Sequence, residues 1–238
     1  MSKNALKNIL TIAILILWVA ASYVICQYVV GLVFKFILGD KLGQTFWLMI
    51  YELVSYLCSI GVIISFPQLI CKKYKTTKTE LGLEEPLSWT GLLLAPAGFI
   101  IYAVLASIAN WLFSFFNWYD ADQVQNIAFG EPSTGIERLL IFIILAIIAP
   151  IAEEIIFRGW LYGKIRKKLP NKAISIVVSS LLVSILFGFL HFQWNVGINV
   201  FCLSLVLCIL RELTGNIHSG ILLHMLKNGL AFYLLWII

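Results

Sequence analysis

The chain has 238 residues, of which 61% are hydrophobic and only 12% are charged, and it carries 8 Trp and 16 Phe. A water-soluble domain of this length would not expose so many large apolar side chains, so the composition excludes the ordinary soluble classes. We therefore expect an all-α, polytopic bundle of transmembrane helices.

A membrane-spanning helix needs about 20 apolar residues, and seven stretches supply them. The first stretch is too long for a signal peptide and lacks a small-residue cleavage pattern, so we interpret it as a retained anchor. An eighth span hidden in the third stretch is the alternative count. The seven predicted spans are 8–34, 53–71, 86–119, 139–152 continuing through a charged motif, 173–190, 192–210 and about 219–238.

The loop charges predict the orientation. With the N-terminus inside, twelve basic residues fall in the inner loops and three in the outer loops, as the positive-inside rule requires. This asymmetry predicts a plasma-membrane protein with an inner N-terminus and an outer C-terminus, and it explains the net charge of +5 without nucleic-acid binding. The inner set is Lys3, Lys7, Lys72, Lys73, Lys75, Lys78, Lys164, Arg166, Lys167, Lys168, Lys172 and Arg211, and the outer set is Lys35, Lys41 and Arg138.

Polar chemistry is concentrated in the second half of the chain. We expect residues 1–134 to form about three spans, with Glu52 as their one buried acid, and residues 135–238 to form a catalytic helical core. The connection 120–138 contains turn residues, and its first part is a candidate short interfacial helix. The five cysteines have no CxxC spacing and are interpreted as small buried hydrophobes. They are Cys26, Cys58, Cys71, Cys202 and Cys208.

The segment "EEIIFR", residues 153–158, places three charged groups in an apolar helix. Glu154 and Arg158 are four residues apart with the acid first, the favourable order for an ion pair. Glu153 points about 100° away and cannot serve the same site as Glu154. Without a partner on its own helix, Glu153 must find a histidine, a metal ion or water across the bundle. A purely structural tie among the three residues explains this segment equally well.

Two later segments shift that balance towards chemistry. "FGFLH" ends at His191, and "HMLKN" places His224 and Asn228 on one helix face about 6 Å apart, so that both can reach a single atom. A lone histidine in a bundle is more often a packing residue. An unpaired glutamate, a histidine and a His/Asn pair on separate helices are harder to explain by packing alone.

These three segments, in this order, resemble the EExxxR, FxxxH and HxxxN motifs of the CAAX prenyl protease and bacteriocin-processing family of intramembrane proteases, also called the Abi family. The continuation "FRGWLYGKI" also resembles the family. The resemblance covers roughly residues 135–235, and the N-terminal spans carry no family motif.

The resemblance implies a role for each matched residue. Glu153 corresponds to the catalytic glutamate, His191 to the histidine that helps to activate water, and His224 with Asn228 to the pair that stabilises the oxyanion. Glu154 and Arg158 correspond to the supporting acid and arginine, while His218 matches no motif. We expect metal-free catalysis and assign no cofactor. The alternative is a zinc ion held by Glu153, His191 and His224, although no HExxH spacing is present.

The resulting prediction is an intramembrane endopeptidase that cuts a membrane-associated peptide or protein tail, with the lipid bilayer and the substrate as its partners. Helix rise places Glu153 about 16 Å and His224 about 12 Å from the inner surface, so the site should be reached from the cytoplasm. His191 lies too deep by this measure. Bacterial peptide processing or bacteriocin self-immunity is favoured over prenylated tails. The alternatives are a non-catalytic immunity or scaffold protein and an ion-coupled transporter using Glu52, Glu153 and Lys227. The oligomeric state is not predicted.

Overall fold

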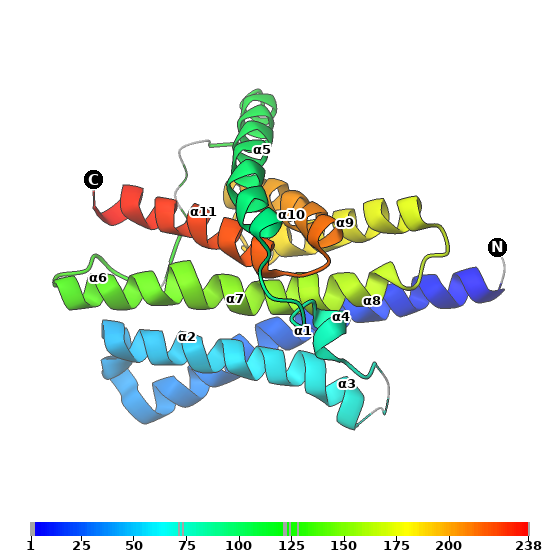
Figure 1. The fold of residues 1–238 in the computed structure, drawn as a ribbon. Helices are drawn as coiled ribbons and strands as arrows, with labels where there is room; N and C mark the ends of the chain where they lie inside the picture. The colour runs from blue at the N-terminus through cyan, green and yellow to red at the C-terminus, as the bar shows by residue number, and fades with distance from the viewer. Residues whose placement is uncertain are drawn as a thin grey trace.

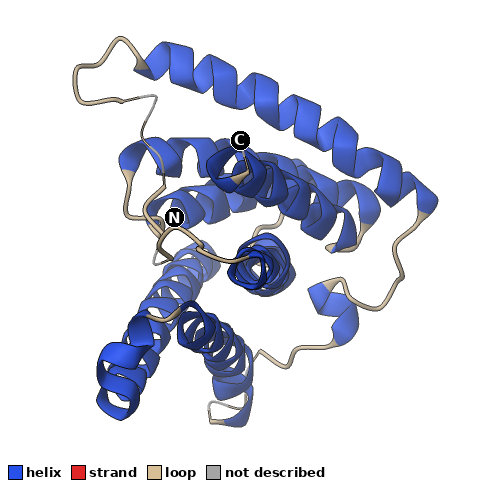
Figure 2. Ribbon diagram, turned by 90° about the vertical axis from the view of Figure 1, so that its left-hand side faces the viewer, coloured by secondary structure: helices blue, strands red, loops and turns tan. Residues whose placement is uncertain are grey.

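The computed structural model describes residues 3–70, 72, 74–120, 123, 125–127 and 129–237. Within these ranges the chain consists of helices and connecting loops, with no strand (Figure 2). The prediction of an all-α bundle is therefore confirmed.

Six helices in the described ranges are long and apolar enough to cross a membrane, which makes the protein a multi-pass membrane protein. Three of the six spans consist of more than one helical element, and all six follow in chain order. They are α1 (Lys3–Leu38) with η1 (Gly39–Gly43); α2 (Thr45–Ile60) with η2 (Gly61–Ser65) and α3 (Phe66–Leu69); α5 (Trp89–Phe113); the motif rod, made of α6 (Gly135–Phe142), η3 (Ile143–Ile148), α7 (Ala149–Glu154), η4 (Ile155–Tyr162) and α8 (Gly163–Arg166); α9 (Lys172–Phe189); and α10 (Trp194–Thr214).

The last predicted span forms a helix of 19 residues, α11 (His218–Trp236), but it is not among the six. His224, Lys227 and Asn228 lower its hydropathy, so a seventh crossing remains a prediction. The stretch 86–119 contains the single helix α5 followed by a turn, so the alternative of an eighth span there was wrong.

Two smaller expectations need correction or restriction. The short interfacial helix after Asp120 was wrong for residues 123 and 125–127, which are not helical, whereas residues 121, 122, 124 and 128 lie outside the described part. Cys26, Cys58, Cys202 and Cys208 are free thiols. Cys71 lies outside the described residues.

The motif rod runs through the middle of the bundle (Figure 1). The helices α1 and α2 lie on one side of it, and α9, α10 and α11 lie on the other, while α5 crosses α10 and α11 at a steep angle. The rod contacts helices from both halves of the chain, so its side chains can meet partners from either half.

Local sequence explains how the rod begins and why it is irregular. Thr134 and Glu137 form a capping box, in which each side chain accepts a hydrogen bond from the other residue's backbone N–H. Pro150 lies in the first turn of α7, and its ring cannot donate the hydrogen bond that a regular helix needs. The wider π-helical turns η3 and η4 flank this point, an irregularity frequently found at functional sites.

Glycines allow close packing on the far side of the rod. A Cβ atom at Gly98 of α5 would lie 2.7 Å from Leu223 Cδ1, and one at Gly188 of α9 would lie 2.7 Å from the backbone oxygen of Gly197. Small residues at helix crossings are typical of membrane bundles, where van der Waals packing replaces the hydrophobic effect. The backbones at these crossings therefore approach each other as closely as the missing side chains permit.

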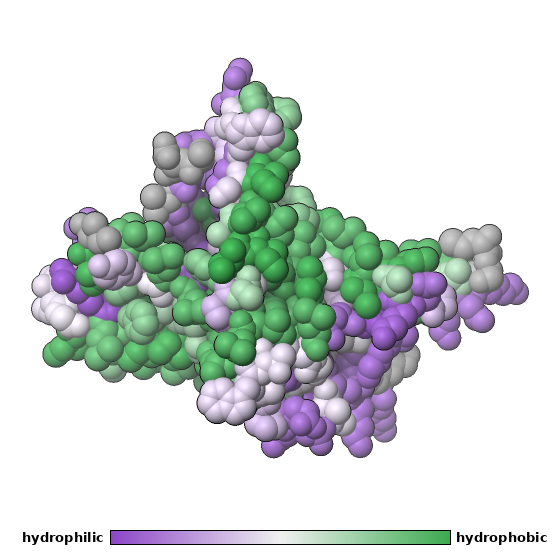
Figure 3. All heavy atoms as spheres, turned by 45° about the horizontal axis from the view of Figure 1, so that its top comes forward, coloured by the Kyte–Doolittle hydropathy of each residue, from purple (hydrophilic) through white to green (hydrophobic). Residues whose placement is uncertain are grey.

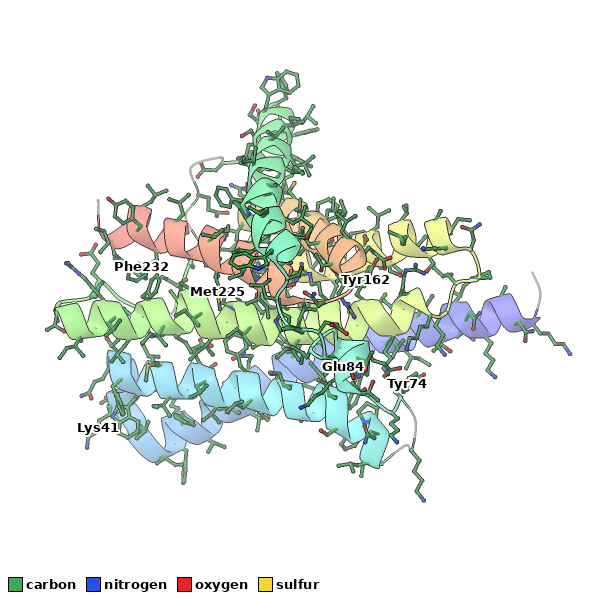
Figure 4. The ribbon with its side chains drawn as sticks, viewed as in Figure 1. Lys41, Tyr74, Glu84, Tyr162, Met225 and Phe232 are labelled. Carbon is green, nitrogen blue, oxygen red and sulfur yellow. The ribbon has the colours of Figure 1, made fainter. Side chains whose placement is uncertain are left out.

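The surface has the character expected of a membrane protein. Hydrophobic residues cover α5 and the middle of the visible face, and hydrophilic residues gather at the lower right, towards the end where α4 (Lys78–Leu81) and α8 lie in Figure 1 (Figure 3). On α11, Phe232 points towards the rod (Figure 4), where the ring of Phe142 lies 5.3 Å from it between centroids. Aromatic packing thus holds α11 against the rod.

Candidate active site

A buried cluster of charged side chains lies on one side of the rod. Glu154 and Arg158 are fully buried, and their Oε1 and Nη1 atoms are 2.9 Å apart. The predicted pair is therefore present. The Arg158 guanidinium also lies over the ring of Phe187, 4.5 Å from its centroid. Removing either partner would leave a buried charge uncompensated.

His224 on α11 completes this cluster and reaches beyond it. Its Nδ1 atom lies 3.2 Å from Glu154 Oε1, and its Nε2 atom lies 3.8 Å from Glu153 Oε2. The expectation that Glu153 and Glu154 cannot serve one site was therefore wrong. Two neighbouring helix positions face different directions, but an imidazole carries a nitrogen at each side of its ring and can contact both acids.

Glu153 is the more accessible of the two acids, with 9% of its surface exposed compared with 0% for Glu154. The Tyr56 hydroxyl of α2 donates a hydrogen bond to Glu153 Oε1 at 3.1 Å. Glu153 lines a cavity of about 220 Å³, which we call the Glu153 cavity. Its polar lining comprises Glu153, His191, Glu52, Tyr23, Tyr56, Gln27 and Gln125.

His191 lies just beyond the end of α9 and faces the same cavity. Its Nδ1 atom is 2.8 Å from the carbonyl oxygen of Phe187, so Nδ1 carries the proton and Nε2 is the basic nitrogen. Burial lowers the pKa of His191, although the nearby negative charge of Glu153 acts in the opposite direction. The depth argument placed His191 too far from Glu153, but the cavity brings the two side chains together.

Asn228 lies one turn after His224 but has a different partner. Its Nδ2 atom donates to the carbonyl oxygen of Leu145 in η3 at 2.9 Å, whereas His224 contacts the two glutamates. The expectation that both side chains reach one atom is not met in this conformation. The spacing of four residues places them on one face, but the direction of each side chain depends on the partner that the neighbouring helix offers.

The described residues contain no group of three or more His, Cys, Asp or Glu side chains placed to hold a metal ion. Glu153 and His224 approach each other, and His191, just beyond the end of α9, lines the same cavity as Glu153. The donor set expected for zinc is therefore not assembled within the described residues.

Sequence reasoning missed the contribution of the N-terminal half. Glu52 and Tyr56 of α2, with Gln27 of α1, form the wall of the Glu153 cavity opposite the rod. Glu52 and Tyr56 are four residues apart and so share one helix face. That spacing was visible in the sequence as a polar pair in an apolar run.

Comparisons with known proteins agree with the motifs. Residues 135–230 match the family described as type II CAAX prenyl endopeptidase Rce1-like. The chain is also 25% identical over 224 residues to the membrane-embedded CAAX protease MroQ of Staphylococcus aureus (strain USA300), an alignment that covers 87% of this chain and 83% of MroQ. No solved structure matches the chain.

Proposed function

We propose that the chain is an intramembrane endopeptidase of the Rce1-like CAAX endopeptidase family, whose model matches residues 135–230, with Glu153 and His191 as its water-activating residues. The observation that carries this proposal is that Glu153, on the rod, and His191, after α9, line one cavity. The two residues lie 38 positions apart in the chain, yet their side chains line the same space.

The arrangement suits hydrolysis of a peptide bond. Glu153 accepts a proton from the water that it holds with the Nε2 atom of His191. The water oxygen attacks the carbonyl carbon, and the C–N bond then breaks as the proton passes to the leaving amine. Burial lowers the pKa of His191, which favours the neutral imidazole that can accept a hydrogen bond from this water.

His224 and Asn228 are proposed to stabilise the negative oxygen that forms during attack. Donors aimed at this oxygen lower the barrier most when they are already in place. His224 is held by Glu154, which is itself held by Arg158. Asn228 donates to the Leu145 oxygen and must exchange this bond for one to the oxyanion.

The proposed substrate is a membrane-associated peptide or protein tail. We place the chain in the plasma membrane with its N-terminus inside, because twelve loop charges against three favour this orientation. In this orientation the loop that carries Gln125 lies outside, so the Glu153 cavity that Gln125 lines is nearer the outer face, against the expected access from the cytoplasm. Bacterial peptide processing or bacteriocin self-immunity is the favoured role, and cleavage of prenylated tails is the second. We also propose that the chain has two parts, with about three N-terminal spans in residues 1–134 and the catalytic helical core in residues 135–238.

The decisive experiment is a cleavage assay on the purified protein in liposomes, comparing wild type with Glu153→Ala, each with and without a strong chelator. Cleavage by wild type alone, unaffected by the chelator, supports the proposal. Inhibition reversed specifically by zinc would support the metal-dependent alternative. If wild type and Glu153→Ala confer the same immunity in cells and neither cleaves peptide, the non-catalytic scaffold replaces the protease.

A reporter assay tests the orientation separately. Reporters fused after Lys78 and Lys168 should be cytoplasmic, and reporters after Gly130 and Ile238 should be external. A cytoplasmic C-terminus would show that the chain crosses the membrane an even number of times.

A further inference from the structure

A second cavity lies beside the Glu153 cavity. It has a volume of about 180 Å³, and we call it the side cavity. Glu52, Tyr56 and Gln125 line both cavities, so they form the wall where the two spaces meet. A substrate held at Glu153 and His191 would therefore have the side cavity as its immediate neighbour.

The rod supplies the apolar wall of the side cavity. Ile144, Leu145 and Ala149 line it, together with Phe129 from the loop before the rod. Ala149 precedes Glu153 by four residues and Leu145 precedes Ala149 by four, so each step moves about 6 Å along the rod away from Glu153. This wall can cover the hydrocarbon stem of a long side chain that starts beside the attacked peptide bond.

The charged side chains that line the two cavities are all acidic. Their lining contains the carboxylates of Glu52 and Glu153 and no lysine or arginine. Within the described ranges, the structure gives the Glu52 carboxylate neither a hydrogen bond nor an ion pair, whereas Glu153 has Tyr56 and Glu154 has Arg158. A half-buried carboxylate without a partner is costly inside a membrane protein, and a cation beside it would offset that cost.

The polar atoms around Glu52 fit a basic head group. Gln125 and Asn126 offer amide oxygens, and Tyr56 offers a hydroxyl oxygen. Lysine and arginine carry only donors, and arginine can bond a carboxylate through two parallel N–H groups. An aliphatic wall beside a carboxylate with neighbouring amides matches both parts of such a side chain.

We propose that the side cavity is a specificity pocket for a lysine or arginine of the substrate next to the cleaved peptide bond, with Glu52 as its counter-ion. This proposal rests on the proposed protease function and names the substrate class of the same site. Glu52 determines which substrate is preferred, while Glu153 and His191 activate the water that hydrolyses the peptide bond.

The test uses quenched-fluorescent peptides in liposomes that contain the purified protein. Mass spectrometry first locates the cleaved bond. In separate peptides, each residue next to the cleaved bond is then replaced by arginine, by its uncharged isostere citrulline, or by glutamate. Wild type should cleave the arginine peptide with a kcat/KM about tenfold or more above that of the citrulline peptide, the scale of one hydrogen bond to a charged group. The glutamate peptide should be the poorest substrate.

The variants isolate the role of Glu52. Glu52→Gln should bring the arginine-to-citrulline ratio close to one, and Glu52→Lys should reverse the preference in favour of the glutamate peptide. The matched control is Glu131→Gln, an exposed acid in the same loop region as Gln125, which should keep the wild-type ratio. Ala149→Leu fills the side cavity and should lower cleavage of peptides with long side chains relative to those with glycine at that position.

The outcomes separate this proposal from the function on which it rests. Cleavage that depends on Glu153 but shows no preference among the three peptides would overturn the pocket and leave the protease standing. An equal loss for all peptides in Glu52→Gln would assign Glu52 to proton transfer and also overturn the pocket. Failure of wild type to cleave any peptide would overturn both. The comparison of peptides on wild type remains decisive even if the Glu52 variants do not fold.

Discussion

The spans before residue 120 are more loosely packed than the transmembrane spans after residue 134. In the most apolar stretches of the first three, 28, 22 and 17% of residues are buried, compared with 50, 39 and 50% in the next three. Polar side chains in the later spans therefore have protein partners at hand. In the N-terminal spans more side chains keep part of their surface exposed, as expected of a surface in contact with lipid.

The same contrast appears across the motif rod. Towards α11, Glu154 and Arg158 are sealed with His224. Towards α2, Glu153 and the polar residues Glu52 and Tyr56 enclose a cavity. The well-packed side holds its charges in place, and the loosely packed side leaves room for a substrate.

The largest effect is expected from replacing Glu153 or Glu154 with glutamine. Glu153→Gln should lower cleavage by at least about 100-fold, because a general base contributes about 10²–10⁴, while the protein remains folded. Glu154→Gln should instead destabilise the fold by about 3–5 kcal/mol, because it leaves Arg158 buried without its counter-ion. Cleavage rates and thermal unfolding in detergent measure the two effects. Equal expression together with equal residual activity would contradict this division.

The next effect concerns the oxyanion. Asn228→Ala should lower kcat by roughly 100-fold, the scale of one lost donor. It should also loosen the contact between α11 and η3, because the Leu145 carbonyl loses its partner. Asn228→Asp serves as the control, since it keeps the size of the side chain but loses the donor. Activity near the wild-type level in both variants would remove Asn228 from the mechanism.

A pair of glycine variants tests the packing contrast directly. Gly188→Ala should destabilise the protein by about 1–3 kcal/mol, because its Cβ atom would lie 2.7 Å from the Gly197 backbone oxygen, which cannot move independently of the backbone. The matched control is Gly61→Ala in the N-terminal half, where no atom lies within 4 Å of the added Cβ apart from the chain neighbours and the helix's own backbone. Thermal unfolding of both variants gives the measurement. A larger loss in Gly61→Ala would reverse the comparison.

The contribution of α2 to the site is smaller. Tyr56→Phe removes the hydrogen bond to Glu153 and should lower kcat/KM about tenfold, as expected for one bond to a charged group. Tyr28→Phe on α1 is the control, because that side chain is 67% exposed. An unchanged rate in Tyr56→Phe would mean that the rod holds Glu153 without help from the N-terminal half.

The smallest expected effect is on stability and comes from ion pairs that join the two halves of the chain at the polar end of the molecule. Glu80 of α4 pairs with Lys164 at 3.0 Å and with Lys167 at 2.5 Å. Burial opposes ionisation of this carboxyl, but the lysines outweigh it and lower the pKa of Glu80 to about 2. A lowered acid pKa stabilises the folded state above the ordinary value of 4.5, and this contribution is lost as the pH falls towards about 2.

Thermal unfolding between these two pH values should therefore show a small loss of stability in wild type that is reduced in Glu80→Gln. Glu84→Gln in the same loop is the control, since its carboxylate pairs with Thr79 and not with a lysine. Identical pH profiles for wild type and Glu80→Gln would show that the two ion pairs do not stabilise the fold.

Local spacing in the sequence determined most of what can be derived from a single helix. The apolar runs predicted six spans that the structure contains, and the four-residue step from Glu154 to Arg158 predicted an ion pair that forms at 2.9 Å. The three motifs also indicated the family whose model matches residues 135–230. Each of these features depends on the helical repeat or on short segments of the chain, and the sequence states both directly.

Only the tertiary structure decided which side chains meet across helices. It placed the ring of His224 against both glutamates, directed Asn228 to the Leu145 carbonyl, and brought Glu52 and Tyr56 to the cavity of Glu153. Side-chain direction depends on the partners offered by neighbouring helices, and the packing of those helices depends on close contacts such as the one between Gly188 and Gly197. Such contacts join residues that are distant in the chain, and no local periodicity records them.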